Sequence, residues 1–155
     1  MTIVVGVDGS AGARAALAFA VDEGRFRGTE VRAVTAWHVP VEAYGSAFVP
    51  PPDVGFASGL EDAARRSLER VLEDQEAAGV VSVVREGPAA RVLLQEARDA
   101  DLLVVGSRGL GGFRGLLMGS VSQQCAHHST CPLVIVPSTA PALDPSAEPP
   151  AGPRV

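Results

Sequence analysis

Short apolar runs alternate with longer amphipathic segments along most of this chain of 155 residues. The first run, residues 2–7, is apolar and largely β-branched, which is typical of a strand buried on both faces of a sheet. Further runs follow at intervals, each bounded by Gly, Pro or charged residues. The pattern predicts strands over residues 2–7, 30–39, 80–85, 102–105 and 132–136.

The segments between these runs carry helix signals. Ser10 is a suitable N-cap, and apolar residues recur at helical spacing from Leu60 onward. Gly79 is expected to end that second helix, and Pro88 to open a third. The predicted helices run from Ser10 to about residue 27, from residue 60 to Gly79, over residues 88–100 and over residues 119–130.

Two segments lack such periodicity. Residues 40–58 are rich in Pro, Gly and small side chains and are expected to form an irregular loop. Residues 138–155 are rich in Pro, Ala and Ser, with little apolar surface to bury, so we expect a disordered tail. The remaining residues, 1–137, form one expected domain, because a hydrophobic content of 46% suffices for a single core at this length.

Strand and helix alternate without a hairpin signal, which indicates an α/β fold with a five-stranded parallel sheet and helices on both faces. In such folds the ligand crevice lies beyond the carboxyl ends of the strands, where the strand order reverses. Asp8 follows the first strand and a glycine-rich loop follows the fourth. Both are therefore expected to face one crevice.

That glycine-rich loop has the outline of a phosphate site. Gly106, Gly109, Gly119 and Ser120 fit the spacing G-x2-G-x9-G-[ST]. A helix start presents unpaired backbone N–H groups and a partial positive charge to an anion. Ser120 and Ser122 add hydroxyl groups, and Arg108 and Arg114 add positive charge. The alternative is a mobile connector in which Ser120 is only the helix N-cap.

Charge and composition exclude several classes of function. All thirteen basic residues are arginine, so neither a P-loop lysine nor a Schiff-base lysine is present. The net charge of −5 argues against a nucleic-acid-binding or anionic-membrane-binding surface. No apolar run is long enough for a membrane span, and the N-terminus lacks the features of a signal peptide. We therefore expect a cytoplasmic protein.

Two further groups of residues have competing interpretations. An acid at the position of Asp8 suits ribose hydroxyls better than phosphates, although it can also simply shape the turn. Cys125 and Cys131 lie near His127 and His128, but their spacing matches no zinc pattern. Buried or half-buried thiols beside surface histidines are the favoured interpretation.

Four motifs together resemble the universal stress protein family, in its ATP-binding branch. They are Val-Val-Gly-Val-Asp-Gly-Ser at the start, Ala-Asp-Leu-Leu-Val-Val-Gly-Ser-Arg-Gly at residues 100–109, Gly-Ser-Val-Ser at 119–122 and Cys-Pro-Leu-Val-Ile-Val at 131–136. The resemblance covers residues 2–137. It implies a Rossmann-like fold of the adenine nucleotide alpha-hydrolase type and a homodimer built through the last strand, residues 133–136.

The resemblance also implies a ligand, ATP with Mg²⁺ bound through its phosphates, and a role for each site residue. Asp8 would bind the nucleoside, Val39 would meet adenine through its backbone and Gly106 would line the ribose. Gly109, Gly119, Ser120 and Ser122 would hold the phosphates. The full expected binding set is Gly6, Val7, Asp8, Val39, Gly106, Arg108, Gly109, Gly119, Ser120, Val121 and Ser122.

The function expected from these residues is that of an ATP-binding stress-response regulator. No catalytic residue is assigned, because no general base is aligned on a γ-phosphate, and positioning with a metal ion alone supports at most slow hydrolysis. Two alternatives remain open. One is a dimeric interaction module that signals without nucleotide; the other is an adenylating enzyme, although such enzymes usually have extra substrate domains.

Overall fold

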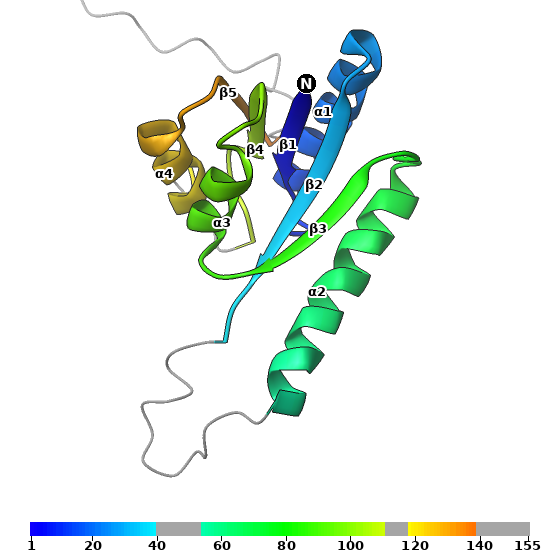
Figure 1. The fold of residues 1–155 in the computed structure, drawn as a ribbon, viewed down its shortest axis with the longest axis vertical. Coiled ribbons are helices and arrows are strands. Elements are labelled where there is room, and N and C mark those ends of the chain that lie inside the picture. Colours follow the sequence, from blue (N-terminus) through cyan, green and yellow to red (C-terminus); the bar gives the residue numbers. More distant parts are fainter. Residues whose placement is uncertain (40–53, 111–117, 139–155) are drawn as a thin grey trace, which may run out of the picture.

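The computed structural model describes residues 1–39, 54–110 and 118–138, and a five-stranded parallel sheet forms its centre (Figure 1). Neighbouring strands pair in parallel throughout. The predicted α/β class and sheet are therefore confirmed. In the spatial order β3-β2-β1-β4-β5, the strands are β1 (Thr2–Gly6), β2 (Glu30–Trp37), β3 (Val81–Glu86), β4 (Leu102–Gly106) and β5 (Leu133–Val136).

Helices cover both faces of the sheet (Figure 1). Helices α1 (Ala11–Arg27) and α2 (Val54–Asp74) pack on one face, and α3 (Ala89–Glu96) and α4 (Ser120–His128) pack on the other. Successive strand residues point to opposite faces, so Ile3 joins the α1–α2 core while Val4 joins the α3–α4 core. Both side chains are almost fully buried, as expected for a strand between two helical layers.

Helix α2 differs from its prediction at both ends. It begins at Val54, inside the expected 40–58 loop, so the prediction is wrong for residues 54–58; residues 40–53 lie outside the described part of the chain. Exposed residues in this first stretch of the helix are Gly55, Phe56 and Ser58. The helix also ends before Gly79. Glu76 adopts φ +49°, the Glu76 amide donates to the Glu73 carbonyl and the Ala77 amide to the Leu72 carbonyl, which is a Schellman motif without glycine.

The other elements match their predictions within a few residues. Ser10 caps α1 by accepting a hydrogen bond from the Ala13 amide, and the helix ends at Arg27 as expected. Helix α3 ends at Glu96, four residues before the predicted position, because the chain turns there toward β4. At that turn the Asp101 amide donates to the Thr2 carbonyl, and the Asp101 side chain accepts from the Thr2 amide.

The chain order reverses beside β1. From β1 the chain builds outward through β2 to β3, then returns to place β4 on the other side of β1. The carboxyl ends of β1 and β4 are therefore neighbours, which is where a parallel α/β sheet opens a crevice. Among the helices described, none is long and apolar enough to cross a membrane.

Candidate functional site

A crevice of about 350 Å³ lies beyond the carboxyl ends of β1 and β4. Its size is within the usual range of small-molecule sites. It is lined by all of the predicted binding residues except Val39, which is not among its described lining residues. The crevice thus brings together Gly6, Val7, Asp8, Gly106, Arg108, Gly109, Gly119, Ser120, Val121 and Ser122.

Asp8 connects two loops at the mouth of the crevice. Its Oδ1 atom accepts a hydrogen bond from the Ser10 amide at 2.9 Å, and its Oδ2 atom accepts one from the Leu110 amide at 3.1 Å. The first bond shapes the turn into α1, and the second fixes the start of the glycine-rich loop. Each carboxylate oxygen keeps a further lone pair, so the side chain can still accept a ligand hydroxyl.

Two glycines of the motif are required because backbone and side chains approach them closely. A Cβ atom on Gly109 would lie 2.5 Å from Oδ2 of Asp8, and one on Gly106 would lie 2.6 Å from the carbonyl carbon of Gly12. Real Cβ atoms do not make such contacts. The spacing G-x2-G therefore lets the end of β4 lie against the turn after β1.

Helix α4 presents to the crevice three amides that have no partner among the described residues. Gly119 is its N-cap, which rules out Ser120 in that role, and no described side chain caps this end. The Gly119 amide donates to the Ser107 carbonyl, and the Gln123 amide returns to the Gly119 carbonyl. The three amides between them, those of Ser120, Val121 and Ser122, have no carbonyl of the helix to bind. Amides in this arrangement are suited to bind an anion.

The two serines at this end have different surroundings. The Ser122 hydroxyl lies 3.0 Å from the Ser107 carbonyl and 2.9 Å from the Gly119 carbonyl, and the side chain is 2% exposed. A hydroxyl has one proton, so Ser122 donates to one of these carbonyls at a time. Ser120 is exposed and makes no side-chain hydrogen bond with the described residues. Ser120 therefore has the freer hydroxyl for a ligand, and Ser122 braces the helix start.

Ser107, which the sequence did not single out, joins the edge strand to helix α4. Its amide donates to the Val136 carbonyl at 2.7 Å, and its hydroxyl accepts from the Ser138 amide at 3.1 Å. Its carbonyl accepts the Gly119 amide. No motif spacing marks Ser107, because its role comes from the pairing of β4 with β5.

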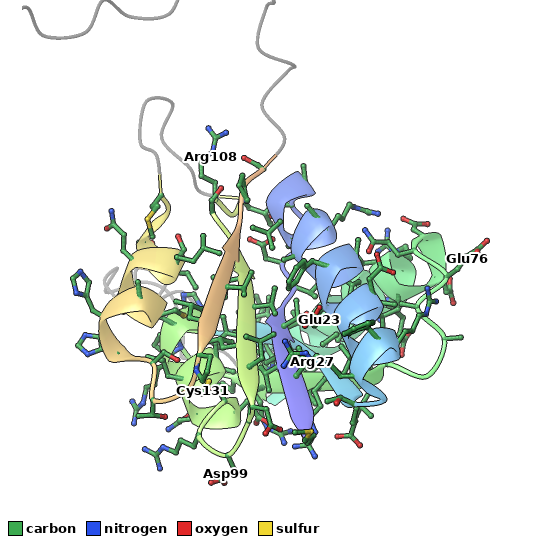
Figure 2. The ribbon with its side chains drawn as sticks, turned by 90° about the horizontal axis from the view of Figure 1, so that it is seen from above. Glu23, Arg27, Glu76, Asp99, Arg108 and Cys131 are labelled. Atoms are coloured by element: carbon green, nitrogen blue, oxygen red, sulfur yellow. The ribbon has the colours of Figure 1, made fainter. Side chains whose placement is uncertain are left out.

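Arg108 stands beyond the carboxyl ends of β4 and β5, and its side chain extends away from the sheet (Figure 2). Its Nε and Nη2 atoms both donate to Oγ of Ser138, at 3.2 and 2.9 Å. Ser138 is the one residue of the expected disordered tail that the structure describes; residues 139–155 lie outside the described residues, as does Arg114.

The crevice also has an apolar wall that sequence reasoning missed. Val34 and Ala36 of β2, Ala89 and Leu93 of α3, and Val105 of β4 line it. These residues carry no functional signal of their own, because buried strand and helix residues look alike in sequence whether or not they border a cavity. Such a wall suits the flat face of an organic ring.

Neither cysteine contributes to the crevice. Cys125 is fully buried in the α3–α4 core, and desolvation by burial raises the pKa of its thiol to about 11. Cys131 is half-buried at the opposite end of β5 from Arg108 (Figure 2), and His127 and His128 are exposed. The prediction of buried or half-buried thiols beside surface histidines is confirmed. Within the described residues no group of three or more His, Cys, Asp and Glu side chains is placed to hold a metal ion.

Comparison with known proteins gives consistent family matches. The model of the universal stress protein family matches residues 1–137. A universal stress protein of Mycobacterium tuberculosis (strain ATCC 25618 / H37Rv) is 38% identical over 137 residues, which are 86% of this chain and 44% of that protein. One of Mycolicibacterium smegmatis is 34% identical over 139 residues, 88% of this chain and 45% of that protein. The chain thus spans less than half the length of these curated relatives.

Solved structures share the fold. A universal stress protein in complex with cAMP is 26% identical, with a TM-score of 0.61 over 90% of this chain and 98% of that one. A universal stress protein from Archaeoglobus fulgidus in complex with dAMP is 22% identical, with a TM-score of 0.50 over 88% and 97%. The expected Rossmann-like fold of the adenine nucleotide alpha-hydrolase type is confirmed by these similarities.

Proposed function

This chain belongs to the universal stress protein family, and from that premise we propose that its crevice binds an adenine nucleotide, with ATP as the preferred ligand. The observation that carries the proposal is the set of three amides at the start of α4 that have no partner in the described part of the chain and that line one crevice with Asp8. The amides can donate hydrogen bonds to a phosphate, and the Asp8 carboxylate can accept them from ribose hydroxyls. Together they match the two ends of a ribose phosphate. The cAMP complex of a related protein supports this assignment.

Each part of the crevice then has a ligand group to bind. The amides of Ser120, Val121 and Ser122 take phosphate oxygens, and Asp8 accepts from the ribose hydroxyls. The apolar wall of Val34, Ala36 and Leu93 contacts the adenine. The backbone contact of Val39 with adenine stays a prediction, because Val39 does not line the described crevice.

Mg²⁺ fits this scheme only as an ion carried by the nucleotide. Among the described lining residues Asp8 is the one carboxylate, and both of its oxygens already accept backbone amides. The exposed hydroxyl of Ser120 is the protein group best placed to reach a phosphate-bound ion. Since no described residue can act as a general base at the phosphate end, we propose a regulator with slow hydrolysis at most. Turnover well above about 1 s⁻¹, the range of dedicated kinases, would contradict this.

The regulatory output is proposed to involve a homodimer formed through β5. This strand lies at the sheet edge, and its four residues are all partly exposed. The Pro132 and Val136 carbonyls face β4, since they accept the Leu103 and Ser107 amides. Backbone groups alternate in direction along a strand, so those of Leu133 and Ile135 point to the open edge and can pair with a second copy. A cytoplasmic location is part of the same proposal.

One observation favours a second candidate, an interaction module that works without nucleotide. The Asp8 carboxylate and the Ser122 hydroxyl already have protein partners, so both contribute to the structure of an empty crevice. Calorimetry separates the two functions. Protein freed of nucleotide is titrated with Mg·ATP and with adenosine, beside a Gly109→Val variant whose added side chain collides with Asp8.

We expect the native protein to bind ATP and the folded Gly109→Val variant to bind it at least about tenfold more weakly, which corresponds to about 1.4 kcal/mol. The matched control is Gly59→Ala on the exposed part of α2, where an added Cβ meets nothing within 4 Å. This control should bind as the native protein does. Absence of binding by the native protein would favour the interaction module instead.

A further inference from the structure

The guanidinium group of Arg108 is held by a hydroxyl rather than by an acid. Its Nε and Nη2 atoms form one edge of the planar group, and both donate to Oγ of Ser138. Most arginines with a described partner pair with a carboxylate, as Arg14 does with Asp74 and Arg85 with Glu96. No described carboxylate lies within ion-pair distance of Arg108. Among the described residues its positive charge is therefore positioned but not neutralised.

The second edge of this guanidinium has no partner in the part of the chain that the structure describes, and it can bind an anion. A guanidinium group has five N–H donors, and Ser138 takes only those of the Nε–Nη2 edge. On the other edge, the N–H groups of Nη1 and the second N–H group of Nη2 make no hydrogen bond with the described residues. This edge has the fork geometry that binds two oxygens of one phosphate. Ser138 and a phosphate can thus bind Arg108 at the same time.

Ser138 is itself fixed in place. Its amide donates to the Ser107 hydroxyl at 3.1 Å, and Ser107 is bonded in turn to the end of β5 and to the N-cap of α4. A Cβ atom on Gly119 would lie 3.5 Å from Cα of Arg108, so Arg108 adjoins the first turn of α4. The hydroxyl that holds Arg108 is therefore anchored through Ser107 to Gly119, the N-cap that precedes the first amides of α4.

We propose that Ser138 is a positioning residue that orients Arg108 toward the phosphate chain of the bound nucleotide, and so sets the preference for ATP over unphosphorylated adenosine. The inference rests on the proposed function. Ser138 lies one residue beyond the segment that the family model matches. A guanidinium that is ordered before the ligand arrives loses less conformational entropy on binding, so the anchored hydroxyl strengthens a contact that Ser138 does not make itself.

The test is the ratio of ATP affinity to adenosine affinity, measured by calorimetry on nucleotide-free protein. For Ser138→Ala we expect ATP affinity to fall about fivefold, the range for one lost hydrogen bond of typical net strength, with adenosine affinity unchanged. Ser138→Thr keeps the hydroxyl and should restore the ratio. Arg108→Gln should lower the ratio by at least as much as Ser138→Ala. Ser82→Ala, at an exposed serine of β3, is the matched control and should leave the ratio unchanged.

Three results would overturn the inference. An unchanged ratio in Ser138→Ala would show that Arg108 needs no anchor, and a higher ratio would show that Ser138 competes with phosphate. An equal loss for ATP and adenosine would show a structural role only. If the native protein binds neither ligand, the proposed function fails as well, and this result is distinct from the other three.

Discussion

The Oδ2 atom of Asp8 accepts a hydrogen bond from the amide of Leu110, a residue 102 positions away in the sequence. This bond ties the turn after β1 to the loop after β4 and so fixes the distance across the mouth of the crevice. The other oxygen of the same carboxylate holds the Ser10 amide. The Asp8 side chain thus orders both loops. Its role can be tested by a substitution that preserves the shape of the side chain.

Asp8→Asn should weaken adenosine and ATP binding together. The amide side chain keeps one oxygen acceptor but places an NH₂ group against either the Ser10 or the Leu110 amide, so one of the two bonds is lost. We expect a loss of about tenfold in affinity for both ligands, in line with the removal of a hydrogen bond to a charged group. Equal binding by native protein and variant in calorimetry would show that Asp8 does not contact the nucleoside.

Ser120 and Ser122 should respond differently to alanine. Ser122→Ala removes a buried hydroxyl that bonds to backbone carbonyls, so we expect it to lower the free energy of unfolding by about 1 kcal/mol. Ser120→Ala changes an exposed hydroxyl and should leave thermal stability unchanged while weakening Mg·ATP binding. Thermal melts and titrations of both variants separate the two effects. A loss of stability in Ser120→Ala and a loss of Mg·ATP binding alone in Ser122→Ala would exchange the roles of the two serines.

Two glycines in helices should give opposite results when replaced by alanine. Gly59→Ala adds a Cβ in open space on α2 and should stabilise the protein by about 0.5–1 kcal/mol through helix propensity. At Gly24 of α1 the added Cβ would lie 2.4 Å from Cγ2 of Val31. Overpacking there should outweigh propensity and cost about 1–3 kcal/mol. Denaturant unfolding of the two variants measures the change in the free energy of unfolding for each. Stabilisation by Gly24→Ala would contradict the close contact with Val31.

Cys125 should be unreactive in the native protein. Burial raises the pKa of its thiol from 9.0 to about 11, so the thiol stays protonated in the folded state while an exposed thiol ionises. Because the folded-state pKa is the higher one, the associated stability is complete below pH 9 and is lost as the pH rises through 11. A disulfide reagent at pH 8 should modify Cys125 only after unfolding, which gives a slow phase in the modification kinetics. Cys125→Ala should remove this slow phase.

Ile135→Pro should separate dimer formation from folding. The Ile135 amide points to the open edge of the sheet, so proline there removes a donor for a second copy without removing a bond to β4. Ile135→Ala is the matched control, because it loses the same side chain but keeps the amide. Sedimentation analysis should show a dimer for the native protein and for Ile135→Ala, and a monomer for Ile135→Pro. A dimer that survives the proline would place the interface elsewhere.

The sequence predicted the sheet and most of the crevice because these depend on signals that are local in the chain. Continuous apolar runs such as Thr2–Gly6 mark strands buried on both faces, and the spacing of Gly106 and Gly109 marks two positions where a Cβ atom would come within 3 Å of a neighbour. The end of α2 could not be predicted, because Glu76 adopts a left-handed conformation for which glycine is the usual signal. The start of α2 was missed because Gly55, Phe56 and Ser58 are exposed, so no buried face marks the helix there.

Ser107 and Ser138 could not have been found from sequence for a different reason. Each owes its role to the pairing of β4 with β5, and the Val104↔Val134 and Gly106↔Val136 register decides which residues meet beyond the strand ends. A serine after a strand is common, and neither its hydroxyl partner nor its neighbour across the sheet can be deduced from spacing. Val39, in contrast, was predicted from the resemblance alone, and the described crevice does not include it.

The position of β1 between β2 and β4 has a consequence for biosynthesis. Ile3 pairs with Val31 on one side and with Leu102 on the other. While the ribosome is still making the first half of the chain, the central strand therefore has only one neighbour, and one of its edges stays open. Pairing between segments so distant in sequence also slows folding. The crevice cannot exist until α4 (Ser120–His128) has been made, so a nascent chain remains unable to bind ligand until residue 128 has been translated.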